Sequence, residues 1–138
     1  MEILAQDKSS YLKGLLIIAK KDNVLAEAEE SIIRQLAKRL GFSSSFYEGI
    51  LQSLLSNDYL SEDPLKFSEV KLSHSFIIDG LMLASSDSVL DEREIDWLRQ
   101  TANVNNINIL WFEDKVREVQ SKSVAGLITK FALDSIID

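Results

Sequence analysis

The chain has 138 residues, 46% hydrophobic and 27% charged, a composition typical of one soluble globular domain. Its net charge of −7 repels phosphate backbones, which argues against nucleic acid as a partner. The chain has no cysteine, which excludes disulfides, thiolate metal ligands and cysteine nucleophiles.

The N-terminal sequence does not have the pattern of a signal peptide. It begins Met1-Glu2, without a basic segment followed by an apolar core. The longest apolar runs, such as residues 15–19, are far shorter than the roughly 20 residues that cross a bilayer. We therefore expect a cytoplasmic protein without membrane insertion, although it could join a peripheral membrane complex.

Sparse helix breakers and the spacing of apolar residues predict an all-α fold. Proline occurs once, at Pro64, and glycine only five times. Leu12, Leu15, Leu16 and Ala19 recur every three to four residues, the spacing of one helix face. No segment alternates with a period of two over the length of a typical strand.

Seven helices are predicted within one compact domain. Repeat A, about 7–56, contains the first three predicted helices, at roughly 7–21, 27–40 and 44–56. After a linker at 57–72, repeat B, about 73–121, contains three more, at roughly 73–86, 92–103 and 109–121. A seventh helix, about 123–137, would carry on one face Val124, Leu127, Ile128, Phe131 and Ala132.

The second half of the chain repeats the first at an interval of 65 residues. Residues 19–37 read AKKDNVLAEAEESIIRQLA and residues 84–102 read ASSDSVLDEREIDWLRQTA, with nine identities in nineteen positions. The register continues to Gly41 and Asn106, residue types that tolerate the left-handed conformation at a helix end. Each half is too short to bury a sufficient core alone, so we expect one domain built from a duplicated three-helix unit.

Aromatic residues fall at matched positions of the two repeats. Phe46 aligns with Trp111, and Tyr47 aligns with Phe112. We expect Phe46, Trp111 and Phe112 to pack in the core or between the repeats. Trp97 is expected to be a core residue as well. The one histidine, His74, is expected just before a helix, in a surface or capping role.

The first copy, IIAKKDNVLAEAEESIIRQLAKRLGFS, resembles the TerB family of tellurite-resistance-associated helical domains. It is also similar to the N-terminal domain of the membrane-anchored DnaJ-like co-chaperone. The shared pattern is an apolar helix ending Ala-x-x-Asp, then a helix that begins with acidic residues and runs into Leu-Gly. The family glycine after the aspartate is Asn23 in one copy and Ser88 in the other. The resemblance covers almost the whole chain and implies an all-α fold with duplicated halves.

The resemblance also implies that the duplicated acidic clusters bind a divalent cation. The ligand candidates would be Asp22, Glu27, Glu29 and Glu30 in the first copy, and Asp87, Asp91, Glu92 and Glu94 in the second. Calcium is the preferred ion because it takes about 6–8 oxygen ligands, several of them carboxylates. One copy offers too few oxygens, so the two copies would have to face each other, or waters would complete the shell.

Helix capping and turn formation explain the same acidic residues without a metal. Asp91 and Glu94 have the spacing of a capping box, and acidic residues in a first turn complement the helix dipole. Asp22 and Asp87 are different, because each ends a predicted helix, where the dipole disfavours a negative charge. An EF-hand is excluded because Val24 and Val89 occupy the third position, where its loop needs an oxygen ligand.

These observations favour a non-enzymatic module that binds other proteins in a stress or metal response. With one histidine and no cysteine, a histidine-dependent catalytic triad has few residues to use. A cation that neutralised the carboxylates would draw the two halves together and so link ion binding to the shape of a partner surface. The alternative is a helical domain that binds a small molecule or lipid in an apolar pocket between the repeats, near the matched aromatic residues.

Overall fold

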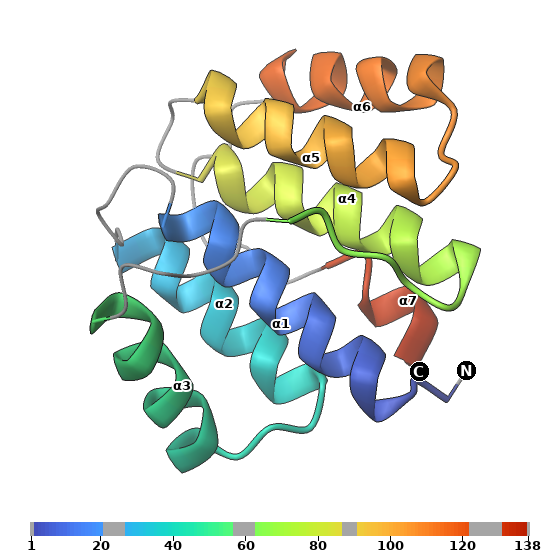
Figure 1. Ribbon diagram of the computed structural model, residues 1–138. Coiled ribbons are helices and arrows are strands. Elements are labelled where there is room, and N and C mark those ends of the chain that lie inside the picture. The colour runs from blue at the N-terminus through green and yellow to red at the C-terminus, as the bar shows by residue number, and fades with distance from the viewer. Residues whose placement is uncertain (1, 21–26, 57–62, 87–90, 122–130, 138) are drawn as a thin grey trace.

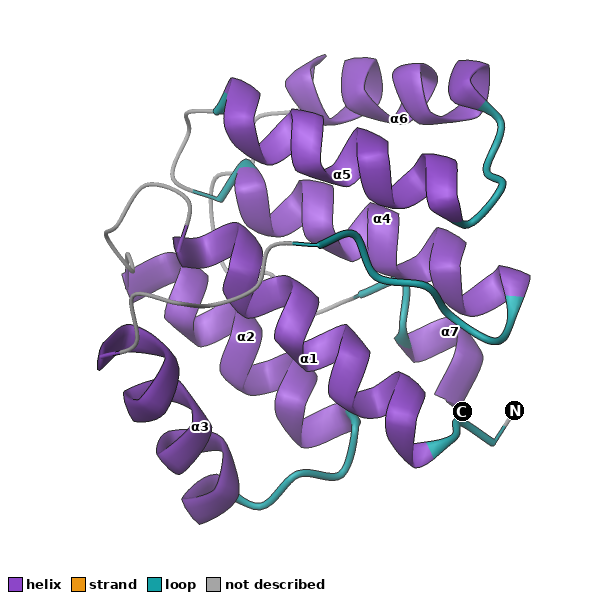
Figure 2. Ribbon diagram, viewed as in Figure 1, coloured by secondary structure: helices purple, strands orange, loops and turns teal. Residues whose placement is uncertain are grey.

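A computed structural model describes residues 2–20, 27–56, 63–86, 91–121 and 131–137 of the chain (Figures 1 and 2). Within these ranges it contains seven helices and no strand, which confirms the predicted all-α class. The helices are α1 (Ala5–Lys20), α2 (Glu27–Arg39), α3 (Ser44–Ser56), α4 (Val70–Ala84), α5 (Glu92–Val104), α6 (Ile109–Ser121) and α7 (Asp134–Ile137). None of the helices in the described ranges combines the length and the apolarity needed to cross a bilayer.

The first six helices begin and end within three residues of the predicted bounds. One difference is at α4, which begins at Val70, so the predicted linker at 57–72 ends earlier than expected. His74 consequently lies inside α4, not before it, and its Nδ1 is 2.9 Å from the Val70 carbonyl oxygen.

The predicted seventh helix, 123–137, is wrong over residues 131–133, and residues 122–130 lie outside the described ranges. Residues 131–133 are not helical because carboxylates of α4 and α7 bind their backbone N–H groups. Asp134 accepts the N–H of Phe131, and Asp79 of α4 accepts those of Ala132 and Leu133. Helix α7 therefore begins only at Asp134.

Helices α1 and α4 lie side by side at the centre of the molecule (Figure 1). Helix α2 packs against α1 and α4, and α5 packs against α4. The outer helices are α3, which contacts α1 and α2, and α6, which contacts α4 and α5. The short helix α7 packs against α4.

Two glycines allow the central helices and their neighbours to approach closely. A Cβ on Gly14 of α1 would lie 2.6 Å from Cε1 of Phe76 in α4. A Cβ on Gly80 of α4 would lie 2.9 Å from Leu98 of α5 and 3.0 Å from Ile18 of α1. Real Cβ atoms rarely come so close to other atoms, so a side chain at either position would force its neighbours to shift.

An aromatic cluster fills the space beside Gly14. The ring of Phe76 contacts Tyr11 edge-on at 5.2 Å between centroids, and it also packs against Phe67 and Trp97. All four side chains are buried, which confirms the prediction for Trp97. Such aromatic pairs are worth about 0.5–1.5 kcal/mol beyond their buried area.

Residues 63–69, which precede α4, are held against the helices by two polar side chains. Asp7 of α1 accepts hydrogen bonds from the backbone N–H, 3.1 Å away, and from the hydroxyl of Ser68. Asn105 donates to the carbonyl of Leu65 at 2.7 Å and accepts the N–H of Phe67 at 2.9 Å. These bonds place the Phe67 ring in the aromatic cluster.

The predicted turn chemistry is present at matched positions. Gly41 has φ +92° after α2, and Asn106 has φ 59° after α5, so both adopt the expected left-handed conformation. Ser43 accepts the N–H of Phe46 before α3, and Asn108 accepts the N–H of Leu110 before α6. These bonds satisfy free N–H groups at the helix starts.

We expect Gly14→Ala to destabilise the protein by about 1–2 kcal/mol, because overpacking outweighs the better helix propensity of alanine. Three other aromatic rings pack against the Phe76 ring and limit how far it can shift. The matched control is Gly49→Ala in α3, where a Cβ would meet no atom within 4 Å. We expect the control to stabilise by about 0.5–1 kcal/mol. Urea unfolding measures the change in the free energy of unfolding for both substitutions. Equal changes for Gly14→Ala and Gly49→Ala would contradict the close approach at Gly14.

Candidate functional site

The acidic residues of the first copy have three different environments at the start of α2. Glu29 is buried, with 1% of its surface exposed. Glu27 is exposed, and Glu30 accepts a 2.6 Å hydrogen bond from Arg34 one turn later. Asp22 lies outside the described residues.

The second copy has a similar division at the start of α5. Glu94 is buried, with 2% of its surface exposed, whereas Glu92 is exposed. Asp91 is the N-cap of α5 and accepts the N–H of Arg93 at 2.8 Å, which confirms the predicted cap. Hydrogen bonds from the side chain and backbone of Arg93 lower the pKa of Asp91. Asp87 lies outside the described residues.

The buried glutamates occupy the same place in both copies. Each is the third residue of its helix, and their positions differ by 65. Within the described ranges, no three acidic or histidine side chains are grouped closely enough to hold a metal ion. In Figure 1 both helices begin at the same end of the bundle, with α1 and α4 between them. A cation site at either turn stays a prediction, because it includes Asp22 or Asp87.

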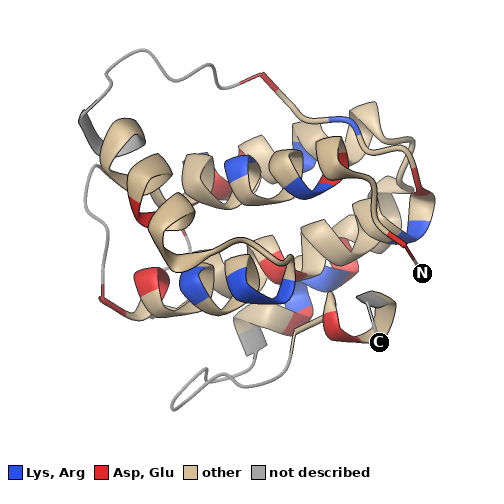
Figure 3. Ribbon diagram, turned by 90° about the horizontal axis from the view of Figure 1, so that it is seen from below, with Lys and Arg blue, Asp and Glu red and all other residues tan. Residues whose placement is uncertain are grey.

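Charged residues elsewhere pair along and between the helices. Figure 3 shows acidic and basic residues interleaved over the helices in view. Arg99 pairs with Asp96 on its own helix at 2.5 Å, and Lys115 pairs with Glu118 at 3.1 Å. Exposed pairs of this kind contribute little to stability.

One ion pair occurs at the same position in each half and joins neighbouring helices. Arg34 of α2 is 3.0 Å from Glu48 of α3, and Arg99 of α5 is 2.8 Å from Glu113 of α6. Each guanidinium also lies over an aromatic ring of the outer helix. The distances to the ring centroids are 5.8 Å for Tyr47 and 5.6 Å for Phe112.

The two aromatic rings differ in one buried atom. Tyr47 and Phe112 are both buried, but only tyrosine carries a hydroxyl. That hydroxyl has no hydrogen bond of normal geometry within the described ranges. Burial raises the pKa of Tyr47 to about 12 and outweighs the Arg34 guanidinium, which is near enough to lower it. Tyr47 thus has the packing role of Phe112, with an additional polar atom.

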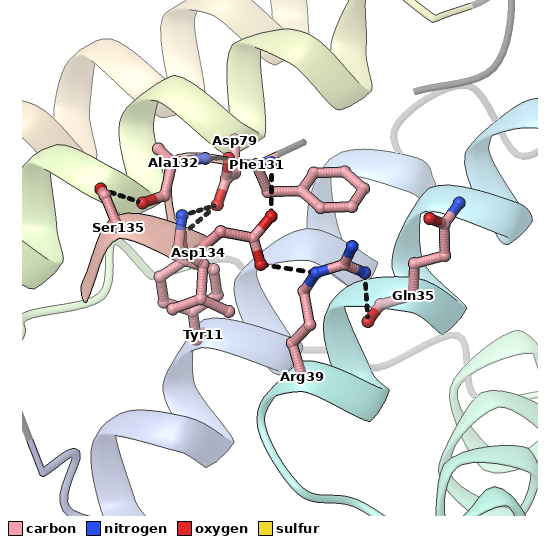
Figure 4. Close-up of polar contacts among 9 residues, drawn as sticks. Tyr11, Gln35, Arg39, Asp79, Phe131, Ala132, Asp134 and Ser135 are labelled. Carbon is pink, nitrogen blue, oxygen red and sulfur yellow. Dashed lines mark hydrogen bonds and ion pairs between the residues drawn. The ribbon is translucent and has the colours of Figure 1, made fainter. Parts of the chain in front are cut away.

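A buried polar network crosses from α1 to α4. The Tyr11 hydroxyl donates a 2.6 Å hydrogen bond to Oδ2 of Asp79 and lies 2.8 Å from the Ser75 hydroxyl. Asp79 also accepts the N–H of Ala132 at 2.7 Å and that of Leu133 at 3.1 Å (Figure 4). Sequence reasoning missed this network, although one aspartate within the apolar run SFIIDGLML was a usable sign.

Burial changes the ionisation of both partners in this network. Burial raises the pKa of Asp79 to about 6, although the Tyr11 hydroxyl and the two backbone N–H groups oppose this rise. Burial and the nearby Asp79 carboxylate raise the pKa of Tyr11 well above its ordinary value. Tyr11 therefore stays a protonated donor, whereas Asp79 changes charge in a range close to neutrality.

A second set of contacts holds the C-terminal segment, which we define as residues 131–137. Arg39 of α2 binds Oδ1 of Asp134 through Nε at 2.6 Å, and its guanidinium lies 4.7 Å from the Phe131 ring centroid. The other Asp134 oxygen accepts the N–H of Phe131 at 2.9 Å (Figure 4). The C-terminal segment is thus bound to α2 as well as to α4.

An exposed apolar surface lies where α5 turns into α6. It is formed by Val104, Ile109 and Leu110, the last with 71% of its surface exposed. A groove of about 340 Å³ adjoins it, with Ile107 and Ile109 among its lining residues. A second groove of about 180 Å³ lies between α4 and α6, lined by Leu81, Met82 and Val119 among others.

Neither groove matches the predicted pocket near Phe46, Trp111 and Phe112, because neither is lined by these residues. The prediction that Phe46 packs in the core is wrong. Its side chain is 51% exposed and stacks on Phe42, because the helical register points Tyr47 inward. Phe112 is buried as predicted, and Trp111 is half-buried beside His74, with 4.5 Å between ring centroids.

Comparison of this chain with protein-family models, with curated proteins and with solved structures gave no match. The interpretation of the site therefore depends on its own geometry and on the internal repeat.

We expect Tyr47→Phe to leave the stability unchanged or to raise it by up to about 1 kcal/mol, because a buried hydroxyl without a partner is removed. The contrasting variant is Tyr11→Phe, which removes a hydroxyl bound to Asp79. That change should destabilise by about 1–3 kcal/mol, since the buried carboxylate loses a donor. Chemical unfolding measures the free energy of unfolding of both variants. A large loss of stability in Tyr47→Phe would show that the Tyr47 hydroxyl has a partner in solution.

Proposed function

We propose that this protein is a non-enzymatic, TerB-like interaction module with a divalent-cation site at each of two repeated acidic turns. In this proposal the cation controls how firmly the two halves pack, and the exposed apolar surface at the α5–α6 corner contacts a protein partner. The stress- or tellurite-related setting follows from the sequence resemblance alone.

The duplication of a three-helix unit is part of this proposal and is supported by the helix positions. Helices α1, α2 and α3 begin at residues 5, 27 and 44, and α4, α5 and α6 begin at residues 70, 92 and 109. Each start is repeated after 65 residues. The ion pairs of Arg34 and Arg99 repeat at the same interval.

The observation that carries the cation proposal is the burial of Glu29 and Glu94. Glutamate is almost never fully buried unless its charge is compensated. Here the same buried glutamate occurs twice, in the first turn of α2 and of α5, each time seven residues after an aspartate, Asp22 or Asp87. Both glutamates also interact with other groups of the protein. A cation shared with the aspartate of the same repeat would add to this compensation, and calcium suits such an oxygen site.

A capping box explains these glutamates without a metal, because the third helical residue can bind the N-cap N–H. The two explanations differ in their response to metal ions. Capping alone makes the stability independent of divalent cations, whereas a site makes it rise with cation concentration.

The apolar α5–α6 corner supports the assignment as an interaction module. Exposed apolar side chains that are grouped together are typical of surfaces that bind other proteins. Leu110 and Ile109 belong to the first turn of α6, and Val104 ends α5. Helix α5 connects this surface to the acidic turn at its other end, so the helix links the two proposed sites.

We expect calcium to raise the thermal midpoint of chelator-treated protein by several degrees. A ligand at 100 times its dissociation constant adds about 2.7 kcal/mol to the free energy of unfolding. Magnesium, manganese and zinc are tested in parallel, because the acidic turns could select any of them. The double variant Glu29→Gln, Glu94→Gln should abolish the rise.

The control for this experiment is Glu69→Gln, which removes one exposed carboxylate before α4. It should leave the calcium effect intact. If no divalent cation shifts the midpoint of the unmodified protein, the cation site is rejected and capping is the role of both glutamates.

A further inference from the structure

The two halves of the chain differ in chemistry at the corner between their second and third helices. In the second half Val104 ends α5, and Ile109 and Leu110 begin α6. The residues 65 positions earlier, at the end of α2 and the start of α3, are Arg39, Ser44 and Ser45. The same helix bounds therefore form with polar residues, so the fold itself does not require an apolar corner.

The apolar side chains of the α5–α6 corner are not buried by their own chain. Val104, Ile109 and Leu110 are three of the six large apolar side chains that are exposed in the described ranges. The corner lies at the outer edge of the bundle (Figure 1). Contact with a partner would remove these side chains from water, which favours association.

The corner is also uncharged. Residues 100–112 read QTANVNNINILWF, without an acidic or a basic side chain. The flanking residues Arg99 and Glu113 pair with each other at 2.8 Å. Two chains that each carry a net charge of −7 repel each other, but this corner adds nothing to that repulsion. An anionic membrane would instead attract basic residues, which the corner lacks.

An exposed side chain and a groove lie next to each other at this corner. The groove of about 340 Å³ is lined by Ala102, Asn103 and Ile107 among others, and by Ile109, the neighbour of Leu110 in the chain. In a twofold dimer each copy supplies the same surface, so a contact needs both the inserted group and its receptor on one patch. The α5–α6 corner provides both.

We propose that the α5–α6 corner binds the same corner of a second copy of this chain, with Leu110 of each copy in the groove of the other. This proposal rests on the proposed function of the corner as an interaction surface, and it names the partner. The acidic turn lies at the other end of α5, outside the contact. The cation site can therefore fail without affecting the dimer.

Sedimentation equilibrium on the complete chain tests for the second copy. A patch with three exposed apolar side chains is smaller than a standard interface, so the dimer should be weak and reversible. We expect the average mass to rise from that of one chain at about 10 µM toward twice that value at about 1 mM. A mass that stays that of one chain over this range would overturn the proposal.

Leu110→Ser identifies the surface, because it gives the second half the residue that the first half has at Ser45. It should raise the dissociation constant of the dimer about 10-fold or more, without a change in net charge. The matched control is Phe46→Ser, which removes an exposed apolar side chain from the first turn of α3. The control should leave the dissociation constant unchanged. Equal effects of the two substitutions would overturn the proposal.

Asn103→Lys tests the groove, and it copies the residue that the first half has at Lys38. It would place an ammonium group in the groove beside Arg99, where Leu110 of the second copy should pack. We expect a rise in the dissociation constant similar to that of Leu110→Ser. A dimer that Asn103→Lys leaves unchanged would overturn this arrangement.

The outcomes for the dimer and for the cation site are separate. A dimer that Leu110→Ser weakens supports the second copy, even if calcium has no effect on the thermal midpoint. A chain that stays monomeric overturns the second copy, even if calcium raises the midpoint. Binding of the monomeric chain to phosphatidylcholine vesicles, lost in Leu110→Ser, would assign the corner to lipid and would also overturn the proposal.

Discussion

The buried contact between α1 and α4 is the constraint on which the rest of the structure depends. It brings the two halves of the chain together through Gly14, the Phe76 ring and the hydrogen bond from Tyr11 to Asp79. Helices α2 and α5 pack on this pair, and α3 and α6 complete the outside. A half of under 70 residues buries too little surface to be stable alone, so sharing this contact explains why the chain forms one domain.

Two buried carboxylates in this core determine where non-helical segments lie. Asp7 binds the residues that lead into α4, and Asp79 binds the residues that lead into α7. A buried carboxylate adds little net stability, but it fixes the position of a backbone segment by satisfying specific N–H groups.

The sequence predicts the helices well, because apolar spacing and the repeat both depend on local pattern. Gly41, Asn106 and Asp91 were likewise identified from local turn and capping rules. The burial of Glu29 was not predicted, although its position three and four residues before the core residues Ile32 and Ile33 was a sign of it.

The role of Asp79 was not predictable in this way, because its partners Ala132 and Leu133 lie more than fifty residues later. The last helix was overpredicted for the same reason, since tertiary acceptors replaced its helical hydrogen bonds. A double-mutant cycle between Tyr11→Phe and Asp79→Asn, followed by urea unfolding, tests the α1–α4 contact most directly. We expect a coupling free energy of about 1 kcal/mol or more, because the two side chains share one buried hydrogen bond. Additive effects of the two substitutions would contradict the account.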